Sequence, residues 1–186
     1  EGLTIFVGCV AADVNFDGLV NVLDVMDVLN HILDIVPLSE EALCAADVFQ
    51  DGMINVIDIV NIVPIILGDT LAKGNAPSFI DISYNSNYIS IESDGKIAGL
   101  QLEYSGIMNL DKKYLPDGWE LSFNDHTILI FSVDGSELID SKLFDFIGNM
   151  EIISAIGAGW NGEEIQAGIT LLPMDYTLNP VYPNPF

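Results

Sequence analysis

The chain lacks arginine altogether and has only five lysines against 28 acidic residues, so its formal net charge is −23 over 186 residues. Binding to nucleic acid or to an anionic membrane surface requires clusters of basic residues that neutralise phosphates. This composition excludes both kinds of partner. High acidity suits a secreted protein that stays soluble in salty, calcium-bearing water.

Long apolar runs are also missing. The best candidate, residues 54–67, is too short to span a bilayer and carries Asp58, Asn61 and Pro64. No signal-like apolar run with a basic flank precedes it, and the chain begins at Glu1 rather than Met. We therefore expect a processed mature protein or a fragment of a longer one.

Residues for catalysis are scarce. The two histidines, His31 and His126, lie in no nucleophile–base motif, and the sequence has neither a glycine-rich phosphate loop nor a zinc spacing. His31 is interpreted as a surface residue of a polar stripe rather than as a ligand. The sequence predicts a protein that is not an enzyme.

What the sequence does contain is a duplicated acidic loop, DVNFDGLVNVLD at 13–24 and DVFQDGMINVID at 47–58. Oxygen ligands at positions 1, 3, 5, 9 and 12, a backbone carbonyl at position 7 and a turn-forming glycine at position 6 make a calcium shell. The first loop supplies Asp13, Asn15, Asp17, the Leu19 carbonyl, Asn21 and Asp24, and the second supplies Asp47, Asp51, the Met53 carbonyl, Asn55 and Asp58. Two solvated acidic turns are the alternative, but two loops in register favour two calcium sites.

The second loop is an imperfect copy, because Phe49 stands at position 3, where Asn15 stands in the first loop. A phenyl ring cannot ligate, and calcium affinity depends on the ligand set and on the rigidity of the site. We therefore predict that the first site binds calcium more tightly.

Only two cysteines occur, Cys9 and Cys44, which lie four and three residues before Asp13 and Asp47. This quasi-equivalent placement suggests a disulfide between the starts of the two loops, and hence an oxidising compartment. Two buried free thiols are the alternative.

Each loop is followed by an apolar helical run whose apolar face is wide. Ser39 marks the capped start of a short connecting helix, Pro64 should bend or shorten the last helix, and Gly68 should end it. About seventy residues cannot bury so much aliphatic surface internally, and exposed apolar patches mark interaction sites. We expect the apolar faces of these helices to form an interaction site for another protein surface.

The duplicated loop–helix unit, residues 9–68, resembles a dockerin, the calcium-dependent domain that binds cohesin domains of extracellular assemblies. The resemblance implies partner-facing residues at positions 10, 11, 17, 18 and 22 of each repeat. These residues are Val22, Leu23, Leu29, Asn30 and Asp34 in the first repeat, and Val56, Ile57, Val63, Pro64 and Gly68 in the second. Dockerins often carry hydroxyl residues at positions 10 and 11, so the aliphatic residues here predict a more apolar partner face.

Beyond a small-residue linker at 68–78, the hydrophobic period changes to two. Segments such as YISIES, IAGLQLEY and TILIFSV alternate apolar and polar residues between turn signals, which predicts an antiparallel β-sandwich. DGKIAGLQLEY and TILIFSVDGSELIDSKLFDF resemble strands of a cohesin-like sandwich. Trp119 and Trp160 are interpreted as core or rim aromatics, with a carbohydrate-binding platform as the alternative.

The tail, residues 176–186, is extended and proline-rich, and its YPNPF resembles the start of the sorting domain of type IX secretion. Such peptides commonly dock onto a sheet edge. The expected division of this α+β, multi-domain chain is therefore a dockerin-like domain at 1–68, a linker at 69–78, a cohesin-like (Ig-like) sandwich at 79–175 and the tail.

These features favour an extracellular, non-catalytic calcium-binding assembly protein whose partner is a cohesin-like domain of the same or another protein. If the dockerin-like unit of one copy binds the sandwich of the next, the contact repeats into an open filament or another homo-oligomer. The two units could instead pack together within one chain. A different alternative is the C-terminal anchoring fragment of a secreted, polysaccharide-degrading enzyme.

Overall fold

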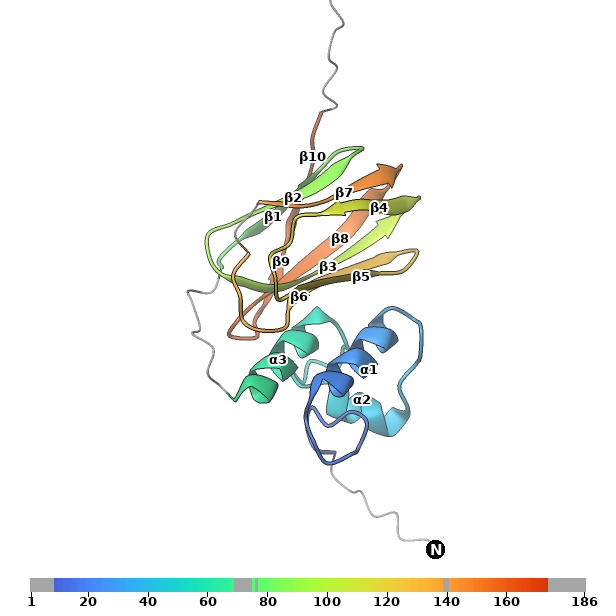
Figure 1. The fold of residues 1–186 in the computed structure, drawn as a ribbon, viewed down its shortest axis with the longest axis vertical. Helices are drawn as coiled ribbons and strands as arrows, with labels where there is room; N and C mark the ends of the chain where they lie inside the picture. The colour runs from blue at the N-terminus through green and yellow to red at the C-terminus, as the bar shows by residue number, and fades with distance from the viewer. Residues whose placement is uncertain (1–8, 69–74, 76, 139–140, 174–186) are drawn as a thin grey trace, which may run out of the picture.

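The computed structural model describes residues 9–68, 75, 77–138 and 141–173. Figure 1 shows the helices lying together against the outer face of one of the two stacked sheets. The helices are α1 (Val22–Ile32), α2 (Glu40–Ala46) and α3 (Val56–Leu67). The strands are β1 (Ile80–Tyr84), β2 (Tyr88–Ser93), β3 (Ile97–Ser105), β4 (Met108–Lys113), β5 (Trp119–Phe123), β6 (Thr127–Ser132), β7 (Lys142–Gly148), β8 (Glu151–Gly159), β9 (Glu164–Gln166) and β10 (Gly168–Leu171). The predicted docking of the tail at 176–186 lies outside the described residues.

The long helices begin in the same way. Asn21 and Asn55 are the N-caps of α1 and α3, and each forms a capping box with an aspartate three residues later. Reciprocal capping satisfies backbone donors that a helix start leaves unpaired. The predicted connecting helix is α2, where the Ser39 side chain accepts a hydrogen bond from the backbone of Ala42.

The C-terminal end of α3 was predicted in part. Gly68 is the C-cap, in the left-handed conformation at φ 71°, as the sequence suggested. Pro64 does not shorten the helix, which continues to Leu67. Proline removes one intrahelical bond, but Pro64 itself and the preceding Ile62 and Val63 are buried, and this packing holds the segment in place.

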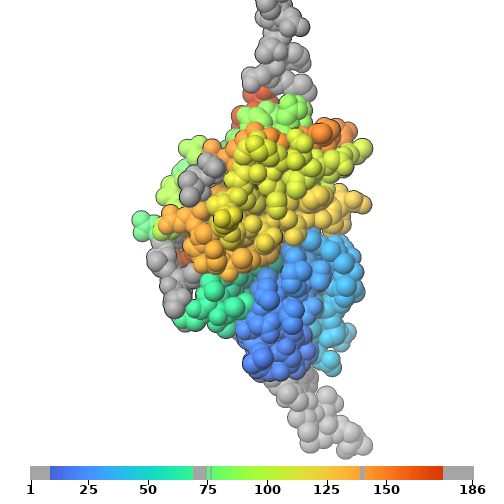
Figure 2. Space-filling view, viewed as in Figure 1, coloured from blue at the N-terminus to red at the C-terminus, as the bar shows by residue number. Residues whose placement is uncertain are grey.

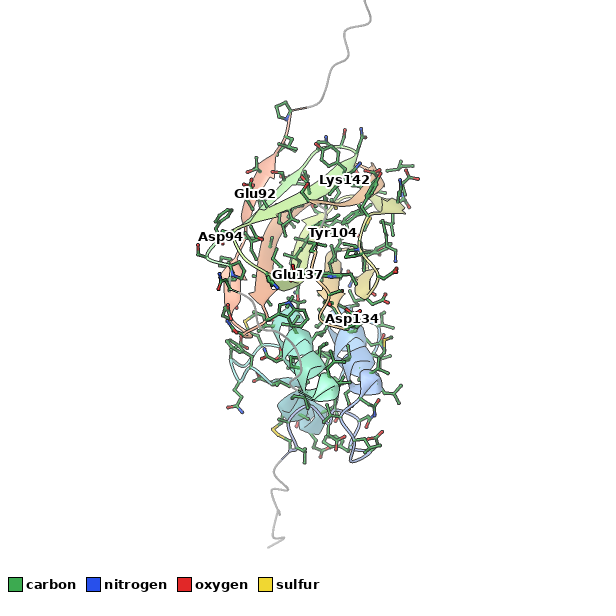
Figure 3. All side chains as sticks on the ribbon, turned by 60° about the vertical axis from the view of Figure 1, so that its left-hand side comes forward. Glu92, Asp94, Tyr104, Asp134, Glu137 and Lys142 are labelled. Carbon is green, nitrogen blue, oxygen red and sulfur yellow. A yellow bond between two sulfur atoms is a disulfide. The ribbon has the colours of Figure 1, made fainter. Side chains whose placement is uncertain are left out.

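The sandwich consists of two five-stranded sheets, ordered β10-β1-β2-β7-β4 and β5-β6-β3-β8-β9. Among the described residues every pairing is antiparallel except that of β1 with β10. The prediction of a β-sandwich in an α+β chain is confirmed, and its sheets are antiparallel apart from this one pairing. Figure 3 helps to locate the layers: Lys142 lies on the first of these sheets, which is farther from the helices, and Asp134 lies near the helices.

Two cores hold the chain together. One lies between the sheets and includes Leu100, Ile130 and Phe144. The other lies around the helices and continues onto the outer face of β3, β6 and β8. Figure 2 shows the helical residues pressed directly against the sandwich. The helical and β parts therefore share a continuous apolar interface.

The tryptophans belong to these cores. Trp119 and Trp160 are each 5% exposed, Trp119 in the core between the sheets and Trp160 in the core beside the helices. The Trp119 indole donates a hydrogen bond to the Ser136 carbonyl, 3.0 Å away. Their interpretation as core aromatics is correct, and neither ring is available as a carbohydrate-binding platform.

Candidate calcium loops and docking face

The two acidic loops have matching backbones. Position 4 has a positive φ in both, 59° at Phe16 and 61° at Gln50, and position 6 does too, 85° at Gly18 and 84° at Gly52. Glycine adopts this region at no steric cost, whereas other residues rarely do. The second loop keeps this shape although its residue at position 3 differs.

In the first loop, the carboxylates reach backbone N–H groups across the turn. Asp24 accepts hydrogen bonds from the backbone of Val14 at 2.8 Å and of Asn21 at 2.8 Å. Asp13 Oδ2 accepts one from Gly18 at 3.2 Å. The second oxygen, Asp13 Oδ1, is buried and has no hydrogen-bond partner in the described part of the chain.

The second loop has a similar arrangement, but both oxygens of its position 1 carboxylate already accept hydrogen bonds, unlike those of Asp13 in the first loop. The two oxygens of Asp47 accept hydrogen bonds from the backbone of Asp51 at 3.1 Å and of Gly52 at 3.0 Å. Asp58 accepts from Phe49 at 3.1 Å and from Asn55 at 3.0 Å. The Phe49 backbone thus takes part in the loop, while its side chain contributes no ligand.

Asp58, the position 12 carboxylate of the second loop, is buried. Burial raises its pKa to about 6, and the neighbouring carboxylates of Asp47 and Asp51 add to the rise, while hydrogen bonds from Asn55 and Phe49 oppose it. A bound cation would reverse this effect, because its charge favours the ionised carboxylate. A cation bound at this loop would therefore offset the burial and the carboxylate repulsion that raise the pKa of Asp58.

The loops fit a hard cation in the chemistry of their donors, since every proposed ligand is an oxygen. In the described ranges no three acidic, histidine or cysteine side chains converge into a metal-holding cluster, because the carboxylates lie against backbone N–H groups instead. Asp13 Oδ1 supports the fit most directly: a buried, unpartnered carboxylate oxygen is costly unless a ligand satisfies it.

The starts of the two loops are tied together. Cys9 and Cys44 form the predicted disulfide, with a Cα–Cα distance of 6.1 Å, and both cysteines are accounted for by this bond. Beside it the Ala12 backbone N–H donates to the Ala45 carbonyl at 2.9 Å. The disulfide therefore fixes the first loop against the helix that precedes the second.

The two repeats differ most in what covers their helix starts. Val56, Ile57 and Val60 of α3 are at most 1% exposed, and the sandwich lies over this part of the helix. Their first-repeat counterparts, Val22, Leu23 and Met26 of α1, are 58%, 56% and 44% exposed. The second repeat is docked on the chain's own sandwich, and the corresponding face of the first repeat is open.

The fit against the sandwich depends on a glycine. A Cβ atom at Gly99 of β3 would lie 2.8 Å from a methyl group of Val56 and 2.9 Å from one of Val60. Gly162, after β8, lies similarly close to the Asn61 side chain. These positions let the helix approach the sheet directly.

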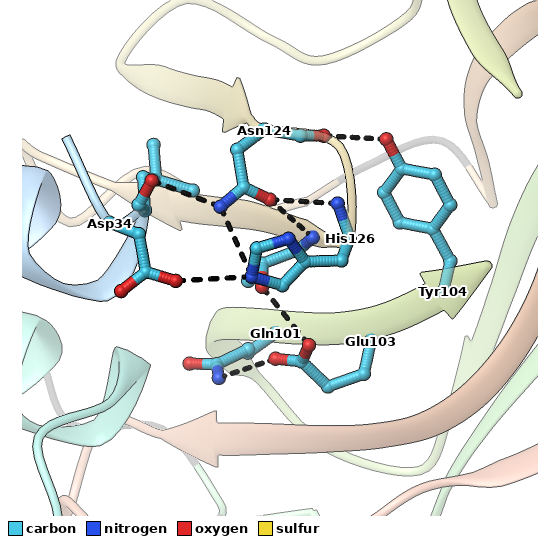
Figure 4. A network of polar contacts seen from close by, with 8 residues as sticks. Asp34, Gln101, Glu103, Tyr104, Asn124 and His126 are labelled. Atoms are coloured by element: carbon cyan, nitrogen blue, oxygen red, sulfur yellow. Dashed lines mark hydrogen bonds and ion pairs between the residues drawn. The ribbon is translucent and has the colours of Figure 1, made fainter. Parts of the chain in front are cut away.

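Polar contacts hold the interface at both ends, and Figure 4 shows those that Asn124 and His126 make at the end of α1. Gln101 Oε1 of β3 accepts a hydrogen bond from the Val56 backbone N–H at 3.1 Å. At the end of α1, Asn124 Nδ2 donates to the Leu33 carbonyl at 2.9 Å, and His126 Nε2 lies 3.2 Å from Asp34 Oδ2. The sandwich thus contacts the start of α3 and the end of α1.

The expected partner-facing residues differ in exposure between the two repeats. The second-repeat residues Val56, Ile57, Val63 and Pro64 are buried, and in the first repeat Leu29 is buried while Val22, Leu23 and Asp34 are exposed and Asn30 is half-buried. Gln101, Asn124 and Gly99 were not identified from the sequence. Alternation placed Gln101 on a strand face, but no sequence signal showed that this face meets a helix.

None of the helices in the described part of the chain combines the length and apolar character needed to cross a bilayer.

Comparison with known proteins supports the predicted dockerin resemblance of the helical part. Residues 11–66 match the family model of the dockerin type I domain. The comparison with curated proteins found no match.

The sandwich is similar to cohesin modules in solved structures. One is the Coh-OlpC–Doc435 type I cohesin–dockerin complex of Clostridium thermocellum, at 10% identity and a TM-score of 0.36, covering 53% of this chain and 97% of that one. Another is a cohesin module of a family 33 glycoside hydrolase from Clostridium perfringens, at 9% identity and 0.31, covering 53% and 100%. A third is the sixth cohesin of scaffoldin B from Acetivibrio cellulolyticus, in complex with Cel5 dockerin, at 10% identity and 0.32, covering 50% and 95%. Residues 11–66 are a dockerin type I domain, followed in the same chain by a β-sandwich.

Proposed function

We propose that the chain is an extracellular, non-catalytic assembly protein whose dockerin domain is held in its docking shape by two calcium ions. The observation that carries the proposal is the apolar start of α3 bound to the outer face of β3, β6 and β8, directly after the second acidic loop. Calcium at each loop would fix where the following helix begins, because the ligand at position 12 lies in its first turn.

The calcium ligands of the proposal are those expected from the sequence, with Asp13 Oδ1 as the best-supported one. The first site should be tighter, since Asn15 provides a ligand where Phe49 cannot. Calcium titration of the full chain, of Asp13→Ala and of Asp47→Ala tests this. Equal affinity of the two surviving sites would contradict the order, and absence of binding would contradict the proposal.

We propose a cohesin-like domain of another protein as the partner of the first repeat. The face formed by Val22, Leu23 and Met26 is exposed and aliphatic, and the equivalent face of α3 binds a β-sheet. An exposed apolar patch of this kind marks a protein interaction site. We also propose that the dockerin domain ends at residue 68 and that the sandwich begins at residue 79.

A head-to-tail filament uses the same α3 contact between copies instead of within one chain. Such an exchange is heterologous, so it propagates unless it closes. Sedimentation and electron microscopy, each with calcium and with chelator, distinguish the forms. Filaments with unchanged lateral contacts after complete calcium removal would exclude calcium-dependent assembly.

The extracellular location is supported by the Cys9–Cys44 disulfide, since such bonds persist in oxidising compartments. An anchoring fragment of a secreted enzyme is the alternative function, and the gene upstream of Glu1 decides it. A long catalytic domain encoded there would favour the enzyme.

A further inference from the structure

The start of α3 has a feature that its counterpart in the first repeat lacks. Three successive backbone N–H groups are bonded: Asn55 to Asp58, Val56 to Gln101, and Ile57 to the Asn55 side chain. Two of these acceptors belong to the second acidic loop itself. The third, Gln101, belongs to the sandwich.

Val56 is 0% exposed, so water cannot replace Gln101 as its hydrogen-bond acceptor. A buried N–H group left without an acceptor is costly. Val22, the equivalent residue of the first repeat, is exposed, and there solvent can serve its N–H group. At the start of α3 the sandwich therefore provides the hydrogen-bond acceptor for the Val56 N–H group. At the start of α1 water can provide the acceptor for the Val22 N–H group.

Gln101 is itself held in place. Its Nε2 donates to Glu103 at 3.0 Å, and the other oxygen of Glu103 accepts a hydrogen bond from Thr127 Oγ1 at 3.0 Å. Figure 4 shows this row of side chains beside the helix start. A side chain whose rotamer is fixed by its neighbours orients the group it contacts, as outer-shell residues do around metal sites.

We propose that Gln101 is a positioning residue for the second calcium loop, so that docking of the sandwich and calcium binding at residues 47–58 strengthen one another. The inference rests on the proposed calcium function. Val56 follows the position 9 residue and precedes the position 12 ligand by two residues. Fixing it fixes where Asp58 projects, which matters most in the loop that lacks a ligand at position 3.

The test compares Gln101→Met, which keeps the shape of the side chain and removes the acceptor, in two backgrounds. Asp13→Ala leaves only the second loop, and Asp47→Ala leaves only the first as a matched control. By titration calorimetry, Gln101→Met should weaken calcium at the second loop about five-fold, the factor of one neutral hydrogen bond, and leave the first loop unchanged. Unchanged affinity at the second loop, or equal weakening of both, would overturn the inference.

Reciprocity gives a second readout in the full chain, since coupled binding events change each other's affinity by the same factor. Calcium should slow hydrogen exchange of the Val56 amide, Asp47→Ala should abolish that effect, and Asp13→Ala should retain it. Equal exchange in the two variants would overturn the coupling even if calcium binds. Failure of the unmodified chain to bind calcium would overturn the proposed function as well.

Discussion

Val60 lies at the centre of the contact between α3 and the sandwich, and Met26 is its exposed counterpart in α1. Judged by the exposure of the first-repeat residues, the sandwich accounts for about half of the burial of Val56, Ile57 and Val60. Full burial of an aliphatic side chain stabilises by about 1.5–3 kcal/mol, so the three together contribute about 3 kcal/mol to docking.

The change Val60→Asp removes one of these contributions and places a carboxylate against Gly99, where it finds no partner. Desolvating the charge would cost several kcal/mol, more than the docking contact contributes, so α3 should separate from the sandwich instead. The loss of folding stability is then limited to the docking contribution of about 3 kcal/mol. The matched change Met26→Asp introduces the same residue on an open face. It should cost less than about 1 kcal/mol, mostly helix propensity.

Urea denaturation in saturating calcium measures both losses, and hydrogen exchange of the α3 amides reports undocking directly. Val60→Asp should accelerate exchange along α3 and β3, while Met26→Asp should leave it unchanged. Equal destabilisation by the two substitutions would refute the asymmetry between the repeats.

Three further changes test the remaining contacts. Gly99→Ala should cost about 1–3 kcal/mol by overpacking, and Val60→Ala should recover part of that loss in the double variant, as a thermal-denaturation cycle would show; strict additivity would count against the close approach. Replacing Cys9 and Cys44 by serine should destabilise the protein by up to about 4 kcal/mol, the loop-closure value for a separation of 35 residues, and an unchanged denaturation midpoint would contradict it. Phe49→Asn should tighten calcium at the second loop in titration calorimetry, and weaker binding would show that position 3 is not a ligand position there.

The helical part was predictable from sequence because its signals are local. Loop spacing, the cap at Ser39 and the C-cap at Gly68 each depend on a few adjacent residues, whereas the capping role of Asn21 and Asn55 was not identified from the sequence. The prediction that Pro64 should shorten the helix was wrong, since burial of Pro64 and of the preceding Ile62 and Val63 lets the helix continue to Leu67. The tertiary setting, in that case, prevails over the local signal.

The sandwich was predictable where period two holds and not elsewhere. β4 was not identified from the sequence, and its pairing with β7 is irregular, with a register shift between Leu110 and Lys112. Residues 164–170 alternate polar and apolar residues like a single strand but divide into β9 and β10, which pair in different sheets. Strand pairing between distant residues leaves no local signal at such positions.

The docking was the least predictable feature. A wide aliphatic face on α3 indicated a partner, but its nature depended on Gly99 and Gln101, which look unremarkable in an alternating strand. One chain holding both surfaces allowed internal packing and filament formation alike. Only the arrangement in space showed the internal contact.

We propose that calcium stabilises the dockerin domain in its docked shape, a claim that hydrogen exchange of the full chain with and without chelator can test. Chelation should abolish most protection of the helices in residues 9–68 and leave the strands of the sandwich largely protected. Helices that keep their protection after complete removal of calcium would contradict the claim.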